Sequence, residues 1–141
     1  MDAALCKGLA SVMRAFRILS LGYEPALLVI RTLLLSRAGY EVVEANSCKE
    51  ALVHIKSRPL DLLLICHSVP FNEQNDIVAA VRVIRSRLPI LCLTADPFQS
   101  YPVDCAPASS TAPEFLEEVS KVLRRGRVAY KKRGERGLEH R

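Results

Sequence analysis

The sequence predicts an α/β fold in which a doubly wound parallel sheet carries helices on both faces. Short apolar runs of strand length alternate with segments of helical periodicity, and the repeat of about 25 to 30 residues is typical of right-handed βαβ crossovers. The run at 60–66 (LDLLLIC) is almost continuously apolar, as a central strand buried on both faces requires. A chain of 141 residues has room for one core, so we expect a single domain.

Four strands are predicted from apolar runs bounded by turn or helix-start signals. The first run closes at Gly22, and the fourth opens at Pro89. Between Asp96 and Ala112 three prolines interrupt the chain, so this stretch holds at most a short strand or a turn of helix. We expect it to be the least ordered part of the domain. The four predicted strands are 16–21, 41–45, 60–66 and 89–94.

Four helices are predicted from apolar residues at helical spacing, and three of them have a start signal as well. Pro25 suits a first helical turn, and two capping boxes, Ser47 with Glu50 and Thr111 with Glu114, mark two further starts. The helices are expected at 25–38, 48–58, about 75–87, and after the second capping box. The first helix should bury one broad face, made of Leu27, Leu28, Ile30, Leu34, Leu35 and Ala38.

The net charge of +5 is concentrated at the end of the chain. Residues 124–141 hold eight Lys or Arg and two Glu, net +6, which leaves −1 for residues 1–123. We therefore divide the chain into a poorly ordered extension (1–15), one folded domain (16–125) and a basic disordered tail (126–141).

The cysteines and the hydropathy pattern indicate a cytoplasmic protein. No apolar stretch reaches the roughly 18 residues of a membrane span, and a secretory leader is not recognisable at the start. The odd number of cysteines and the lack of a C-x-x-C motif signal neither a disulfide framework nor a zinc site. They are Cys6, Cys48, Cys66, Cys92 and Cys105.

The order of elements and the local strings resemble the receiver domain of bacterial response regulators, over roughly residues 16–125. The segment RILSLGYEPALLVIRTLLLSRAGYEVVEANSCKEAL is similar to that family's first two strands and helices, DLLLICHSVP to its third strand and loop, and LPILCLTA to its fourth strand. The resemblance implies a five-stranded parallel sheet with the flavodoxin-like strand order 2-1-3-4-5. It also implies a role in a two-component, phosphorelay-type pathway.

The same resemblance shows which chemistry this chain has lost. Receiver domains transfer a phosphoryl group with an acidic pair after the first strand, an aspartate after the third, a hydroxyl after the fourth and a lysine after the fifth. The first four positions fall on Gly22, Tyr23, Cys66 and Thr94, and the lysine position, counted back from the last helix, falls near Ser109. Only Thr94 matches, so the carboxylates that would bind Mg²⁺ and accept phosphate are missing. No lysine lies between Lys56 and Lys121.

We therefore expect a vestigial pocket that holds no catalytic residue, metal or cofactor, and a chain that is not an enzyme. Glu24, Glu73 and Asp96 lie near the carboxyl ends of strands and are the residues from which a shifted site would be built. Cys66 is either a thiol sensor or a small residue that fills space, and no lysine is available to activate it. Tyr23 either plugs the former metal position or faces a partner.

The leading hypothesis is a phosphorylation-independent, receiver-like module that binds a sensor kinase, another regulator or a transcription component. The alternatives are a thiol sensor acting through Cys66 and a DNA-associated regulator acting through the basic tail. The absence of aromatic interleaving favours a solvated tail over a nucleic-acid-binding one, and no membrane partner is expected. Candidate tail contacts are Arg124, Arg125, Arg127, Lys131, Lys132 and Arg133.

Overall fold

The computed structural model describes residues 15–95, 99–102, 105–111 and 113–125. The predicted extension and tail therefore lie outside the described residues, except for Ala15, and the division into domains stays a prediction there. No helix within the described ranges is long and apolar enough to cross a membrane.

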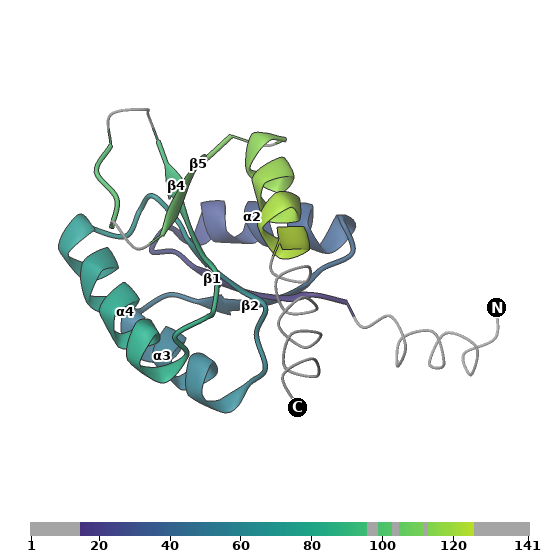
Figure 1. Cartoon of the computed structure of the whole chain (residues 1–141). Coiled ribbons are helices and arrows are strands. Elements are labelled where there is room, and N and C mark those ends of the chain that lie inside the picture. Colours follow the sequence, from purple (N-terminus) through teal and green to yellow (C-terminus); the bar gives the residue numbers. More distant parts are fainter. Residues whose placement is uncertain (1–14, 96–98, 103–104, 112, 126–141) are drawn as a thin grey trace, which may run out of the picture.

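The predicted sheet is confirmed: five strands are all parallel and lie in the order β2-β1-β3-β4-β5 (Figure 1). The central strand β3 is buried along its whole length, as its apolar run predicts. The edge strands of the sheet are β2 and β5, and β1 and β3 lie side by side in the interior of the sheet. The strands are β1 (Arg17–Leu21), β2 (Glu41–Ala45), β3 (Leu62–Ile65), β4 (Ile90–Thr94) and β5 (Ala106–Ser109).

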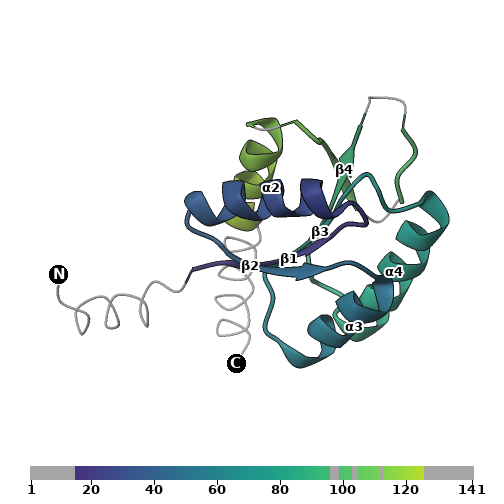
Figure 2. The ribbon, with the colours of Figure 1, turned by 180° about the vertical axis from the view of Figure 1, so that it is seen from behind.

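Helices cover both faces of the sheet, and each face has its own buried core. Helix α2 (Pro25–Arg37) and a helix at 114–125 lie on one face, while α3 (Cys48–Ser57) and α4 (Phe71–Ile84) lie on the other (Figures 1 and 2). Successive residues of a strand point to opposite faces, so Leu64 and Cys66 join the core under α2, whereas Ile65 and Cys92 join the core under α3 and α4. The two cores are separated by the sheet itself.

The buried face of α2 differs from the predicted one. Leu28, Arg31 and Leu35 are its buried residues, whereas Ile30 is 52 % exposed and Ala38 is exposed. Positions 28, 31 and 35 follow helical spacing as well as the predicted stripe does, but they include an arginine. The prediction is therefore confirmed for Leu28 and Leu35 and wrong for Ile30 and Ala38, because the sheet packs against the stripe that contains Arg31.

Helix α4 begins four residues before its predicted start and ends three residues before its predicted end. Pro70 is the N-cap residue with φ −60°, and Gln74 is buried in the first turn, where its Nε2 donates to the carbonyl oxygen of Val69 at 2.8 Å. The periodicity of Ile77 and Val81 is confirmed, but the first turn was missed because the residues that follow Phe71 in it, 72–74, are all polar.

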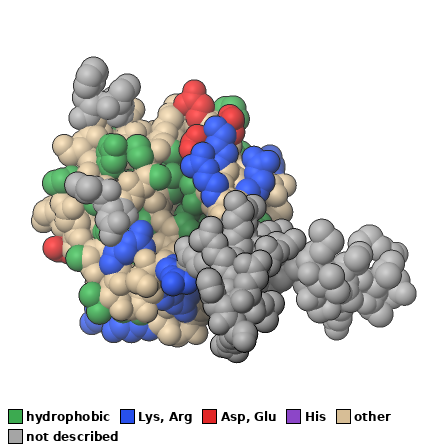
Figure 3. Space-filling view, viewed as in Figure 1, with side chains coloured by type: hydrophobic (Ala, Val, Ile, Leu, Met, Phe, Trp, Pro, Cys, Tyr) green, Lys and Arg blue, Asp and Glu red, His purple; other side chains and the backbone are tan. Residues whose placement is uncertain are grey.

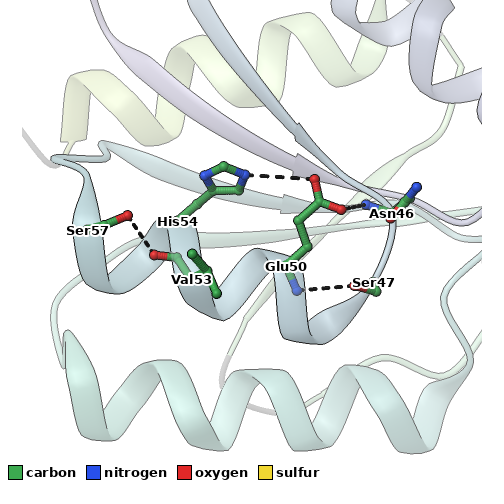
Figure 4. Close-up of polar contacts among 6 residues, drawn as sticks. All are labelled: Asn46, Ser47, Glu50, Val53, His54 and Ser57. Atoms are coloured by element: carbon green, nitrogen blue, oxygen red, sulfur yellow. Dashed lines mark hydrogen bonds and ion pairs between the residues drawn. The ribbon is translucent and has the colours of Figure 1, made fainter.

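The capping box of α3 is formed largely as predicted (Figure 4). Ser47 Oγ accepts a hydrogen bond from the Glu50 amide at 3.1 Å, while the Glu50 carboxylate accepts from the amide of Asn46, one residue earlier than in the standard box. The same carboxylate lies 3.9 Å from Nε2 of His54. These contacts fix the start of α3 directly after β2.

The proline-rich stretch contains the short edge strand β5, one of the two possibilities left open for it. Pro107 is tolerated because an edge strand leaves one side of its backbone unpaired. The last helix covers residues 114–125, and the Thr111 hydroxyl donates to the Glu114 carboxylate at 2.8 Å just before it. Phe115, Val119 and Leu123 bury its apolar face against the sheet.

Candidate functional site

The carboxyl ends of the strands bring the predicted pocket residues to one edge of the sheet. Gly22 and Tyr23 directly follow β1, Cys66 directly follows β3, and Thr94 and Ser109 end β4 and β5. Leu21 pairs with Ile65 and Thr94 pairs with Ser109, so the strands end at matching levels. In doubly wound folds this edge is where ligands bind.

Gly22 and Cys66 pack directly against each other at the centre of this edge. The Cys66 amide donates to the Leu21 carbonyl at 2.8 Å, and the Gly22 amide donates to the Ala45 carbonyl at 3.1 Å. A Cβ atom at position 22 would lie 3.2 Å from Cys66 Sγ. Because that distance is tighter than ordinary van der Waals contact, the cysteine sulfur occupies the space that a side chain at position 22 would need.

The Cys66 thiol has no exposed surface and is surrounded mainly by apolar groups. Ser20 Oγ lies 3.9 Å from its sulfur. Burial raises the pKa of the thiol, and the opposing effects of the Arg31 charge and of the Ser20 hydrogen bond are smaller. Cys66 therefore remains a protonated, inaccessible thiol at neutral pH, which favours the space-filling role over the thiol sensor.

Arg31 of α2 is the residue that the sequence reasoning missed. Its side chain is only 4 % exposed, its Nη2 donates to His67 Nδ1 at 3.2 Å, and its Nη1 is buried without a hydrogen-bond partner. Burial, then the nearby Arg31 charge, lowers the pKa of His67. The pocket therefore contains a buried cation, although no lysine lies between Lys56 and Lys121. Its only sequence signal is its helical spacing from Leu28 and Leu35.

Tyr23 turns its hydroxyl group toward the helices on the opposite face from α2. The hydroxyl donates to Glu73 Oε1 of α4 at 2.8 Å and lies 3.3 Å from Cys48 Sγ of α3. The Tyr23 amide donates to Ser68 Oγ at 2.9 Å. Burial, followed by the contacts with Cys48 and Glu73, raises the pKa of the tyrosine. This arrangement favours the plug over the partner-facing role.

The shifted acidic site is not assembled by the described residues. Glu73 accepts the Tyr23 hydroxyl, Glu24 is exposed, and Asp96 lies outside the described residues. Within the described part of the chain, no three His, Cys, Asp or Glu side chains are grouped closely enough to hold a metal ion.

The hydroxyl groups of Thr94 and Ser109 make local contacts. Thr94 Oγ1 donates to the Ala108 carbonyl at 3.2 Å, within the pairing of β4 and β5. Ser109 Oγ lies 2.8 Å from Thr111 Oγ1 and accepts from the Thr111 amide at 3.3 Å. Both hydroxyls thus hold the connection into the last helix.

The basic residues proposed for nucleic-acid contact are only partly described. Arg124 and Arg125 are exposed at the end of the helix 114–125, and the other four lie outside the described residues. Acidic and basic side chains lie next to each other over this helix (Figure 3), where Lys121 Nζ is 3.4 Å from both Glu117 and Glu118. The described part of this surface is therefore mixed in charge.

No protein-family model matches the chain, and no curated protein is similar to it in sequence. Its fold is that of several solved receiver domains. A response regulator receiver domain (CheY-like) from Methanospirillum hungatei JF-1 is 19 % identical with a TM-score of 0.68, and the match covers 82 % of this chain and 98 % of that one. The response regulator TrrA of Thermotoga maritima, in complex with Mg²⁺–BeF, is 23 % identical with a TM-score of 0.65, covering 76 % and 98 %.

A further match comes from the crystal structure of histidine kinase ThkA in complex with the response regulator TrrA. The matched chain of that complex is 25 % identical to this chain, with a TM-score of 0.65, and the match covers 77 % of this chain and 98 % of the matched one. The match thus covers nearly the whole of each matched chain.

Proposed function

We propose that this chain is a receiver-like signalling module of a two-component pathway, that it acts in the cytoplasm by protein–protein contact, and that it works without being phosphorylated. The observation that carries the proposal is that positions 22, 23 and 66, at the edge where a phosphoacceptor would lie, hold no carboxylate, and that the nearby Glu73 is already hydrogen-bonded. The Cys66 sulfur packs on Gly22, and the Tyr23 hydroxyl takes a hydrogen-bonding site of Glu73.

The chemistry of phosphoryl transfer supports this reasoning. An acyl phosphate forms on a carboxylate, and Mg²⁺ takes oxygen ligands that usually include one or two carboxylates. Gly22, Tyr23 and Cys66 supply no carboxylate, either as the nucleophile or as a ligand of Mg²⁺. Burial raises the pKa of Cys66 and so keeps its side chain a thiol. Arg31 alone would attract an anion, but a cation without a nucleophile does not transfer a phosphoryl group.

An exposed apolar patch supports the protein-binding part of the proposal. Val29, Ile30 and Leu33 lie on the outer side of α2, and each is more than half exposed at 52 %, 52 % and 54 %. Grouped apolar side chains on a surface favour a protein contact. One of the similar solved structures is a complex of a histidine kinase with a response regulator, so we take a sensor kinase as the first partner to test.

The phosphorylation part is tested by incubating the purified protein with acetyl phosphate and Mg²⁺, and separately with beryllofluoride and Mg²⁺. We expect no acid-labile phosphate on the chain and no bound fluoride signal in ¹⁹F NMR. Thermotoga maritima TrrA, which was crystallised with Mg²⁺–BeF, is the positive control. Cys66→Asp should stay unphosphorylated as well, because positions 22 and 23 still lack carboxylates. Stoichiometric phosphate on the native chain would refute the proposal.

The partner is tested by pull-down of the host's sensor kinases, followed by binding measurements with the purified kinase. We expect Ile30→Asp with Leu33→Asp to weaken binding at least tenfold, because charge replaces buried apolar contact. Val83→Asp is the matched control: Val83 is 87 % exposed, but it lies on α4, across the sheet from α2. Equal losses in both variants, or no kinase binding at all, would contradict this part.

A further inference from the structure

Two cysteines that take no part in the candidate site meet where β5 begins, on the face of the sheet opposite Cys66. Cys92 lies in β4 and Cys105 directly precedes β5, and their sulfur atoms are 2.6 Å apart. Two non-bonded sulfur atoms ordinarily stay about 3.5 Å or more apart, and a disulfide requires side chains that point at each other over such a short span. The pair therefore already has the proximity that disulfide formation needs.

The surroundings give the two thiols different accessibility. Cys92 is fully buried in the core under α3 and α4, whereas Cys105 is half-buried and packs on the edge of that core. The Cys105 thiol donates to the Pro102 carbonyl at 3.2 Å, which leaves its sulfur to accept from the Cys92 thiol. The more accessible Cys105 is therefore the cysteine that a peroxide reaches first.

We propose that Cys92 and Cys105 are a reversible redox pair, which a hydroperoxide oxidises to an intramolecular disulfide. The inference is independent of the proposed signalling function, because it uses neither the phosphoacceptor edge nor the α2 patch. Cys66 belongs to the core on the other face of the sheet and takes no part.

The chemistry balances with hydrogen peroxide as the oxidant. The Cys105 thiolate attacks one peroxide oxygen and becomes a sulfenic acid, and the other oxygen leaves as hydroxide and takes up a proton to form water. The Cys92 sulfur then attacks the Cys105 sulfur, the S–O bond breaks, and the departing hydroxide takes the proton of Cys92. Two thiols and one peroxide thus yield one disulfide and two waters, and an added dithiol reverses the change.

The disulfide would fasten the start of β5 to β4. The strand β5 has four residues, lies at the edge of the sheet and contains Pro107, so few backbone hydrogen bonds hold it. Oxidation would therefore hold β5 against β4 more tightly than the backbone pairing alone does. The effect would be confined to the side of the domain formed by β4, β5 and the last helix.

The experiment is mass spectrometry of the full chain after treatment with hydrogen peroxide and alkylation of the remaining thiols. No Lys or Arg lies between Arg87 and Lys121, so trypsin leaves both cysteines in one peptide, 88–121. We expect this peptide to lose two hydrogens and to escape alkylation. Chymotryptic cleavage after Phe98 should then leave two fragments joined until dithiothreitol is added.

Variants distinguish the pair from general oxidation. Cys105→Ser, at a half-buried position, should abolish the cross-link with the fold kept, and Cys92→Ser should do the same if it folds. Cys48→Ser is the matched control, because Cys48 is also half-buried but contacts Tyr23 instead of the pair. The Cys48→Ser variant should form the same cross-link between Cys92 and Cys105 as the native chain. Full alkylation of the native peptide after peroxide, or a cross-link from Cys105 to another cysteine, would overturn the proposal.

Discussion

Replacing Arg31 by Met should stabilise the domain, although it removes a buried hydrogen bond. Arg31 as a whole residue is 4 % exposed, its Nη1 is buried without a partner, and its Nη2 donates to His67. An unsatisfied buried polar group costs about 1–3 kcal/mol, and removing the bond to His67 costs about 0.5–1.5 kcal/mol. Met retains most of the apolar stem, so little packing is lost.

We therefore expect Arg31→Met to raise the free energy of unfolding by about 1 kcal/mol, and the midpoint of thermal unfolding by roughly 4 °C or more. Urea unfolding followed by circular dichroism gives the free energy, and thermal scans give the midpoint. Arg37→Met is the matched control, because Arg37 lies on the same helix but is exposed, and its effect should stay within about 0.5 kcal/mol.

A loss of more than about 1 kcal/mol in Arg31→Met would refute the reasoning, since it would mean that the guanidinium is fully satisfied in solution. A gain would show that the domain keeps Arg31 at a cost in stability. A residue kept at such a cost, at the edge where this fold binds ligands, is expected to serve function.

Three further predictions concern other parts of the domain. Burial and the Arg31 charge lower the pKa of His67, so the unfolded chain takes up that proton at a higher pH than the folded one. The stability that comes from a neutral His67 is present above about pH 6.5 and is lost as the pH falls through the pKa of the folded state. His67→Gln should therefore flatten the decline in the free energy of unfolding that urea titrations measure between about pH 7.5 and 5. An unchanged slope of stability against pH would contradict this prediction. Ser47→Ala removes the cap of α3 and should cost about 1 kcal/mol in the same assay, whereas Ser57→Ala, whose exposed hydroxyl bonds within the helix, should change stability by under about 0.5 kcal/mol; equal effects would argue against capping. Phe115→Ala truncates a side chain that is 1 % exposed and should cost about 3–5 kcal/mol, and a cost under about 1 kcal/mol would mean that the last helix does not dock through this ring.

The elements that the sequence predicts well are those whose signal is local. The strand 41–45 is observed with the predicted bounds, and the other three predicted strands differ by two residues or fewer at either end. The Ser47 cap depends on two residues three positions apart, so it too was visible in the sequence. The short strand β5 has no periodicity and includes Pro107, so only its pairing with β4 identifies it.

The sequence predicted where in the fold the candidate residues lie, but it did not predict all of the side chains that surround them. Counting along the strands puts Gly22, Cys66 and Thr94 at the carboxyl edge, because parallel strands end together. The burial of Arg31 was not predicted, since two stripes of α2 have helical spacing and only packing against the sheet selects one. The exposure of Ile30 and the burial of Arg31 are therefore one and the same error of prediction.

The amino-acid sequence by itself determined the alternation of strands and helices, the buried central strand and the absence of carboxylates at positions 22, 23 and 66. The tertiary structure alone decided which face of α2 is buried, that the Tyr23 hydroxyl reaches Glu73, and that Cys92 meets Cys105. The physical reason is the distance along the chain between the residues that interact. Periodicity and capping act between residues a few positions apart, whereas these contacts join segments that meet only when the sheet and its helices pack.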